Sequence, residues 1–196
     1  MKFCSSCGAT IVIRIPSGDN MPRHVCDSCE TIHYLNPKIV NGCIAEWQDK
    51  ILLCKRAIEP RYGYWTLPAG FMENGETTWQ GAARETYEEA CATVSDLSLY
   101  GVFNLPHINQ VYVMFRGNVV DGQASPGTES LEVGFYQEDE IPWNELAFPV
   151  VKETLELYFA DRKRGSFTTK MGDIIRHPDQ SLEIKRYDSP PLKSDN

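Results

Sequence analysis

The chain has 196 residues, of which 42% are hydrophobic and 23% are charged, an ordinary balance for one folded domain with a small appendage. It contains no run of eighteen apolar residues and no apolar leader after Met1. We therefore expect neither a membrane span nor secretion, and a cytoplasmic location. The net charge of −8 is concentrated in residues 41–162, where eight Lys and Arg stand against nineteen Asp and Glu. Such a surface disfavours binding of nucleic acid and attracts divalent cations.

Residues 1–36 hold four of the seven cysteines as two Cys-x2-Cys pairs, separated by eighteen residues: Cys4, Cys7, Cys26 and Cys29. Each pair can form a tight knuckle, and four thiolates close a tetrahedral Zn²⁺ site without an open position, which predicts a structural zinc. The segment has too few apolar residues for a core, so its expected strands at 11–15 and 24–26 need the bound zinc to hold them together. The alternatives are a redox Cys-x2-Cys or free thiols.

Alternating strand and helix patterns follow from residue 37. We expect strands in six stretches: 39–47, 51–55, 64–67, 97–103, 111–119 and 132–136. One helix is expected at 77–90, where Thr77 and Gln80 have capping-box spacing and Tyr87 contributes to an apolar side, and a second at about 148–163. The mixture predicts an α+β domain over residues 37–170. Residues 171–196 are interpreted as a C-terminal extension, partly disordered, with the disorder at 188–196.

The first of these helices carries three carboxylates at i, i+3 and i+4, which are Glu85, Glu88 and Glu89. This spacing places them on one face, where like charges repel one another. A hard divalent cation, Mg²⁺ or Mn²⁺, is the counter-charge that oxygen ligands favour. Bound there, it suits hydrolysis at phosphorus, with a further carboxylate as base. The alternative is a solvated acidic helix face.

The wider spacing, G-x5-E-x7-R-E-x-x-E-E, resembles the Nudix box, G-x5-E-x7-R-E-U-x-E-E-x-G-U, in which U is a bulky aliphatic residue. The matching positions are Gly70, Glu76, Arg84, Glu85, Glu88 and Glu89. Three packing and turn positions depart from the pattern: Thr86, Cys91 and Ala92. The resemblance implies a Nudix fold, which is a mixed β-sheet sandwiched by helices, here with an N-terminal zinc ribbon.

The same resemblance implies roles for particular residues. Glu85, Glu88 and Glu89 would be catalytic and would bind Mg²⁺ or Mn²⁺. Gly70, Glu76 and Arg84 would be structural, with Glu76 and Arg84 pairing loop to helix. An acidic residue outside the box often adds a metal contact or acts as base in the family. Glu132 is the first candidate for it and Glu129 the second. Family members are commonly dimers, so a homodimer is expected.

A zinc ribbon ahead of a Nudix domain resembles two groups of enzymes. The NADH pyrophosphatases carry a Ser-Gln-Pro-Trp-Pro-Phe-Pro-type motif, whereas residues 100–112 of this chain differ from it. The plant chloroplast-type enzymes that act on FAD and ADP-ribose are similar in residues 52–60, 64–70 and 126–132. This second resemblance implies cleavage of FAD to FMN and AMP, or of ADP-ribose to AMP and ribose 5-phosphate, with a small-molecule nucleotide as the partner.

Substrate contacts are expected from aromatic and cationic side chains near the box. Tyr64, Trp65 and Phe71 could stack on a base or flavin, although aromatic residues in strands also form cores. Arg56 and Arg61 could bind phosphates. Two readings from other classes stay open, namely a nucleotide-sensing or partner-binding module without turnover and an enzyme that removes NAD caps from RNA.

Overall fold

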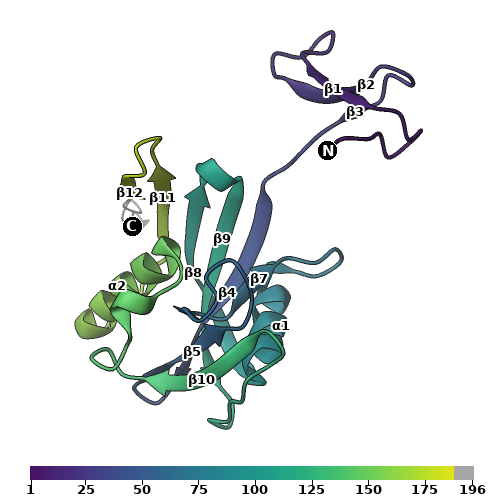
Figure 1. The fold of residues 1–196 in the computed structure, drawn as a ribbon. Coiled ribbons are helices and arrows are strands. Elements are labelled where there is room, and N and C mark those ends of the chain that lie inside the picture. Colours follow the sequence, from purple (N-terminus) through teal and green to yellow (C-terminus); the bar gives the residue numbers. More distant parts are fainter. Residues whose placement is uncertain (188–196) are drawn as a thin grey trace, which may run out of the picture. The chain divides into compact units, whose positions relative to one another are not determined.

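The computed structural model describes residues 1–187 and divides the chain into two compact units, residues 1–37 and a second unit that begins at Lys38 (Figure 1). The disorder predicted for residues 188–196 concerns positions outside the described residues. Neither helix of the described chain is long and apolar enough to cross a membrane.

The first unit is a three-stranded antiparallel sheet in the order β1-β2-β3. Its strands are β1 (Ile11–Arg14), β2 (Arg23–Cys26) and β3 (Ile32–His33). The buried apolar residues of this unit are Cys4, Pro16, Val25 and Cys26, so the hydrophobic core is very small. A sheet of this size is marginal in water without a crosslink or a metal.

The second unit is built on one mixed sheet with two α-helices. Its strands are β4 (Lys38–Trp47), β5 (Lys50–Arg56), β6 (Trp65–Thr66), β7 (Ala69–Phe71), β8 (Val94–Leu105), β9 (Gln110–Val119), β10 (Ser130–Tyr136), β11 (Lys170–Arg176) and β12 (Leu182–Tyr187). Its helices are α1 (Thr78–Ala90), α2 (Pro149–Arg164) and the short 3-10 turns η1 (Pro106–Ile108) and η2 (Trp143–Glu145).

The sheet has the order β10-β5-β4-β9-β8-β11-β12, with β6 paired to β5 and β7 paired to β4. The pairs β4–β9 and β8–β11 are parallel, and the remaining pairs are antiparallel. The predicted α+β class is therefore confirmed.

Alternation along the central strands gives each face of the sheet its own core. In β5, Leu53 belongs to the buried cluster that includes Leu155 of α2, whereas its neighbour Leu52 belongs to the cluster that includes Ala82 of α1. Successive strand residues point to opposite faces, so the two helices cover opposite sides of the sheet (Figure 1). The expected sheet between helices is confirmed, and α1 presents its acidic residues on one side of it.

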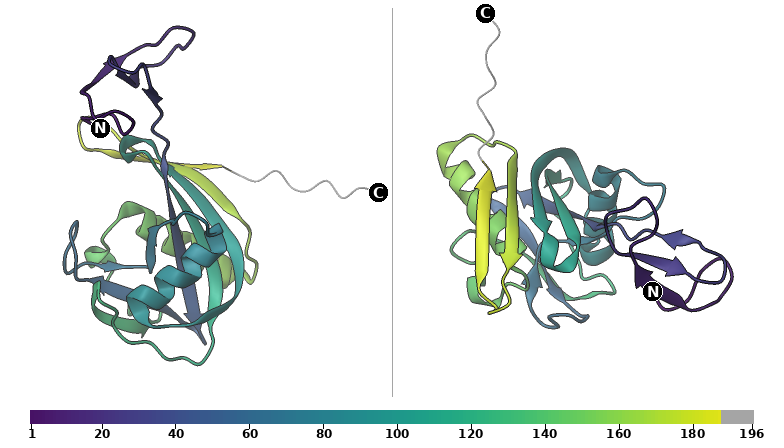
Figure 2. Two further views of the ribbon diagram at one scale, coloured as in Figure 1. Left: turned by 90° about the vertical axis from the view of Figure 1, so that its right-hand side faces the viewer. Right: turned by 90° about the horizontal axis from the view of Figure 1, so that it is seen from above.

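Residues 170–187, most of them assigned from sequence to a C-terminal extension, form the strands β11 and β12 at one edge of the sheet (Figure 2). Two buried carboxylates of α2 anchor them. Asp161 accepts a 2.7 Å ion pair from Lys170, and Glu153 accepts two hydrogen bonds from Arg186 at 2.6 and 3.0 Å. These residues therefore complete the sheet of the second unit.

Candidate active site and metal centres

Helix α1 begins with the capping box that the sequence predicts. The Thr77 hydroxyl accepts the Gln80 N–H at 3.4 Å, and the Gln80 side chain accepts the Thr77 N–H at 2.8 Å. The expected apolar side is only partly correct. Ala82 is buried, but Tyr87 is 60% exposed, so Tyr87 lies on the outer face of the helix.

Arg84 connects the loop before α1 with the acidic face of the helix. It donates to both oxygens of Glu76, at 2.9 and 2.8 Å, and to the Phe71 carbonyl at 3.1 Å. Its Nη1 donates at 2.7 Å to both Glu85 and Glu88. The hydrogen bonds from Arg84 and from the Glu73 N–H lower the pKa of Glu76 to about 2, so this carboxylate stays ionised. A single guanidinium thus serves three carboxylates.

The three box carboxylates differ in their environments. Glu89 is 6% exposed, and its Oε2 accepts the Ala69 N–H at 3.2 Å. Burial raises its pKa to about 8, and the neighbouring charges of Glu85 and Glu129 add to this. Burial also raises the pKa of Glu85, whereas the Glu88 side chain is 56% exposed. Burial thus favours the neutral form of Glu89 as long as no cation lies beside it.

Gly70 of β7 lies directly beneath Glu85. A Cβ on Gly70 would stand 2.3 Å from the carboxyl carbon and from both oxygens of Glu85. Van der Waals contact needs about 3.4 Å or more, so any side chain at Gly70 would displace this carboxylate. A glycine is therefore required at this position of the box, because the Glu85 carboxylate lies too close to leave room for a side chain.

The loop before β10 packs on the end of α1, because the N–H groups of Ser125 and Gly127 donate to the carbonyls of Ala90 and Glu89 at 2.8 and 3.0 Å. Glu129 follows in this loop, and its charge contributes to the raised pKa values of both Glu85 and Glu89.

Glu132, the first candidate from sequence, lies elsewhere. It is the register partner of Lys55, with which it forms a 3.7 Å ion pair. The adjacent Val133 packs in the α1-side core, so the alternation of β10 places Glu132 on the opposite face from α1. The structure therefore favours Glu129 over Glu132 as the additional carboxylate.

Arg56 is a buried cation beside the acidic face, with an exposed fraction of 9%. Its Nε donates to the Pro60 carbonyl at 2.9 Å, and its guanidinium lies 5.1 Å from the centre of the Phe148 ring. Its positive charge acts to lower the pKa of Glu89. Within residues 1–187 its Nη groups make no hydrogen bond, so they remain available to an anion.

The aromatic candidates separate into one core residue and two exposed ones. Trp65 is 6% exposed and packs edge-on against Tyr136 at 5.2 Å, which places it in the α2-side core. Tyr64 and Phe71 are 38% and 47% exposed. Arg61 stacks over Tyr64 with 5.5 Å to the ring centre. The structure thus leaves Tyr64 and Phe71 accessible for stacking but not Trp65.

The three departures from the box pattern are accommodated at the end of α1. Cys91 adopts the left-handed conformation, with φ of 49°, and its N–H donates to the Tyr87 carbonyl at 2.7 Å. It therefore takes the backbone geometry that a glycine adopts more easily. Thr86 and Ala92 are fully buried, and the Thr86 hydroxyl donates to the Ala82 carbonyl at 2.7 Å.

The four cysteines of the first unit come together in one cluster. The Sγ atoms of Cys4, Cys7, Cys26 and Cys29 all lie within 4.8 Å of one another, with 3.7 Å between Cys4 and Cys29 and 3.5 Å between Cys7 and Cys26. Tetrahedral zinc with bonds of about 2.3 Å requires sulfur separations of about 3.8 Å. The cluster matches this geometry, and the Nε2 atom of His33 lies 3.3 Å from the Cys4 sulfur.

Asn41 is a residue of the site region that the sequence analysis did not identify. It lies in β4, is completely buried, and neither atom of its amide has a hydrogen-bond partner among the described residues. The available signal was a polar residue inside the otherwise apolar run at 39–45.

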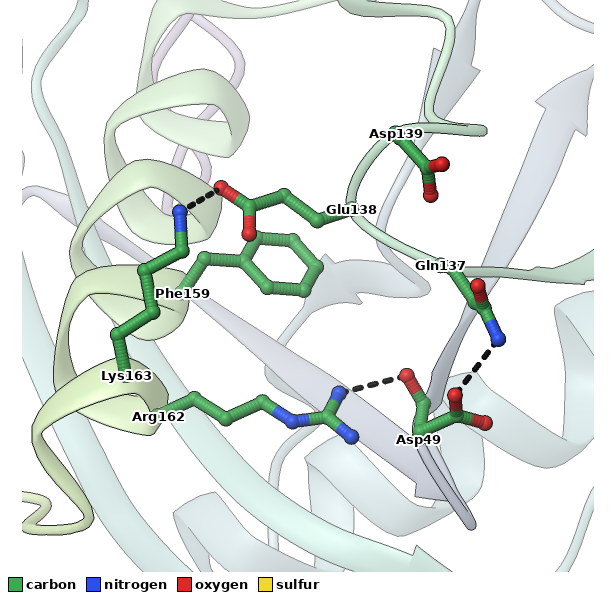
Figure 3. A pocket seen from close by; sticks show the side chains of 7 residues that line it. All are labelled: Asp49, Gln137, Glu138, Asp139, Phe159, Arg162 and Lys163. Carbon is green, nitrogen blue, oxygen red and sulfur yellow. Dashed lines mark hydrogen bonds and ion pairs between the residues drawn. The ribbon is translucent and has the colours of Figure 1, made fainter.

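A pocket of about 270 Å³ lies at the turn between β4 and β5 and the end of α2 (Figure 3). Arg162 donates to the Asp49 carbonyl at 2.6 Å, and Lys163 pairs with Glu138 at 2.7 Å. Its cations are thus already bound to groups of the protein. None of the site residues expected from sequence lines this pocket, so it is separate from the acidic face of α1.

Comparison with known proteins agrees with this geometry. Residues 2–35 match the model of the Nudix N-terminal zinc ribbon, and residues 36–158 match the model of the NUDIX domain. A crystal structure of a Nudix hydrolase from Nitrosomonas europaea is 55% identical and superposes with a TM-score of 0.86, covering 89% of this chain and 99% of that one.

Two curated relatives are more distant. The ADP-ribose pyrophosphatase of Methanocaldococcus jannaschii is 34% identical over 121 residues, which is 59% of this chain and 69% of that protein. An NAD-capped RNA hydrolase of Pseudomonas aeruginosa is 26% identical over 166 residues, which is 82% of this chain and 56% of the relative. The chain thus spans only about half of that second relative. The match to the NUDIX domain covers more than half of the chain, and the chain belongs to the Nudix hydrolase family, with the family's N-terminal zinc ribbon.

Proposed function

We propose that the protein is a Mg²⁺- or Mn²⁺-dependent diphosphatase of nucleoside diphosphate derivatives, with Glu85, Glu88 and Glu89 holding the cation. The observation that carries this proposal is geometric: the three carboxyl groups share one face of α1, Glu85 lies on Gly70, and Arg84 contacts both Glu85 and Glu88. An all-oxygen donor set of this kind suits a hard divalent cation. When bound, the cation neutralises the diphosphate and lowers the pKa of an attacking water.

The residues of the chain divide the remaining tasks. Arg84 and Glu76 hold the loop against the helix, so that the carboxylates keep a fixed geometry. Arg56 binds a phosphate oxygen with its unpaired Nη groups, as a buried guanidinium does most strongly. Glu129 accepts the proton of the attacking water, which requires a carboxylate close to the ligand set. The Cys4, Cys7, Cys26 and Cys29 cluster binds a structural zinc.

We infer that ADP-ribose and FAD are the preferred substrates. The archaeal relative is named an ADP-ribose pyrophosphatase, and the sequence segments quoted above favour the FAD and ADP-ribose group. NAD-capped RNA or NAD(H) is the second candidate, because relatives named for NAD-capped RNA hydrolysis align over up to 82% of this chain. The acidic charge of residues 41–162 favours the small nucleotides. We also propose that the protein is cytoplasmic and forms a homodimer. Light scattering of the purified protein tests the dimer.

The test is product chromatography after separate incubation with FAD, ADP-ribose, NADH and NAD-capped RNA in the presence of Mg²⁺. We expect AMP with ribose 5-phosphate from ADP-ribose, or AMP with FMN from FAD. The Glu88→Gln variant should lose this activity. Glu156→Gln is the matched control, because Glu156 is an exposed carboxylate of α2 on the other side of the sheet. Absence of products from every substrate in a folded, metal-bound protein would favour a nucleotide-sensing module instead.

A further inference from the structure

Asn41 is an anomaly in the core of the second unit. Its side chain is completely buried, and both Oδ1 and Nδ2 lack a partner among the described residues. Buried amides in folded proteins nearly always form hydrogen bonds, and an unpaired one destabilises the fold. An apolar residue of similar size would pack at this position without that penalty. The amide therefore needs a reason other than stability.

The position of Asn41 in β4 directs its amide toward α1. Asn41 has the same strand parity as Cys43, which packs in the α1-side core. A Cβ built on Gly81 of α1 would stand 2.3 Å from Nδ2 of Asn41 and 2.8 Å from Oε1 of Glu76. The amide and the Glu76 carboxylate thus border the same small space, which exists because residue 81 has no side chain. Glycine inside a helix is unfavourable relative to alanine, and this space accounts for it.

Glu76 connects this part of the core to the acidic face of α1. Its two oxygens receive the Arg84 guanidinium, and the same guanidinium contacts Glu85 and Glu88. Asn41 is also the register partner of Gly70, the residue on which the Glu85 carboxylate lies. Asn41 therefore lies next to two residues that position the acidic side chains. One is Glu76, which binds Arg84, and the other is Gly70, on which Glu85 lies.

We propose that Asn41 is a positioning residue of the active site. Its amide donates to the Glu76 carboxylate through one bridging water beside Gly81. In this way it orients the Arg84 guanidinium and, through it, Glu85 and Glu88. The effect on turnover rests on the proposed function, whereas the effect on Arg84 does not. Asn41 contacts neither substrate nor metal in this proposal.

The test compares the wild type with Asn41→Leu, which has the same number of side-chain heavy atoms, branched in the same way, and no donor. The first readout is hydrogen exchange of the Arg84 Nε–H group, followed by NMR and assigned with Arg84→Lys. We expect exchange at least about ten-fold faster in Asn41→Leu. For ADP-ribose, we expect kcat to fall at least about ten-fold with KM changed less than about three-fold. Thr86→Val is the matched control, since it removes another buried polar group from the α1–sheet interface away from Glu76.

Each outcome decides the proposal. Unchanged Arg84 exchange in a folded Asn41→Leu variant overturns it, because the amide would then have no influence on the Glu76–Arg84 pair. Altered Arg84 exchange without any turnover in the wild type supports the positioning role and refutes the proposed function. Gly81→Ala gives a second approach, because its Cβ occupies the shared space and should mimic Asn41→Leu in Arg84 exchange. In an Asn41→Ala background the same change should have little further effect.

Discussion

Gly70→Ala should separate activity from stability. The added Cβ would lie 2.3 Å from the Glu85 carboxyl group, whereas ordinary contact begins near 3.4 Å, so the carboxylate must move by about 1 Å. A misplacement of about 1 Å costs on the order of 100-fold in rate, which corresponds to about 2.7 kcal/mol in the activation barrier. The atoms displaced are the far end of a flexible side chain, so the free energy of unfolding should change by less than about 1 kcal/mol.

The assay is kcat for ADP-ribose at saturating Mg²⁺, together with thermal unfolding followed by circular dichroism. Gly134→Ala in β10 is the matched control, because its Cβ would stand 2.9 Å from the Tyr136 ring, another movable side chain, without approaching α1. Full activity of Gly70→Ala would refute the reasoning that the glycine exists to admit Glu85. A cooperative loss of the fold would show that the strain reaches the backbone.

Three further predictions follow from the same geometry. Glu88→Gln should reduce kcat by at least about 100-fold with an unchanged melting temperature, since its side chain is 56% exposed; wild-type turnover would exclude Glu88 as a ligand. Chelation should release one zinc per chain, which a colorimetric assay measures, and should unfold residues 1–37. The amide resonance of the buried Val25 should then move to a random-coil position. A native Val25 resonance after zinc release would contradict a structural role of the metal. Burial raises the pKa of Asp161, but hydrogen bonds from Lys170 and others outweigh it and leave that pKa lowered. The stability from Asp161 is therefore present above its unfolded pKa and lost as pH falls through the folded one. Lys170→Met should move the acid-unfolding midpoint to higher pH, and equal midpoints would refute the role of this pair.

The long strands and both helices were predictable from sequence, because their hydrophobic periods are unambiguous and α1 carries its own capping box. The short strand β6 lies within the predicted stretch 64–67, whereas β3 and β7 depend on tertiary pairing rather than on a pattern of their own. The strand β12 contains Glu183, Lys185 and Arg186, and its anchor to Glu153 is 33 residues away in the chain. Such long-range ion pairs leave no local signal.

The choice between Glu129 and Glu132 shows why site residues are harder to predict than elements. The pairing of β10 with β5 has a register shift between Ser130 and Glu132. One extra residue reverses which side chains face α1, and a sequence does not reveal such a bulge. Asn41 was missed for a related reason, because its importance depends on the absent side chain of Gly81, a residue forty positions later in the chain.

The distribution of the seven thiols allows α1 to be labelled at one site. Cys43 and Cys54 have exposed fractions of 0% and 1%, and the four cysteines of the first unit share one cluster. Cys91 is the remaining cysteine, and it is exposed at the end of α1. A maleimide fluorophore or spin label should therefore attach to the native, zinc-loaded protein at this single position. Spectroscopy could then follow the end of the helix during substrate binding without any engineered cysteine.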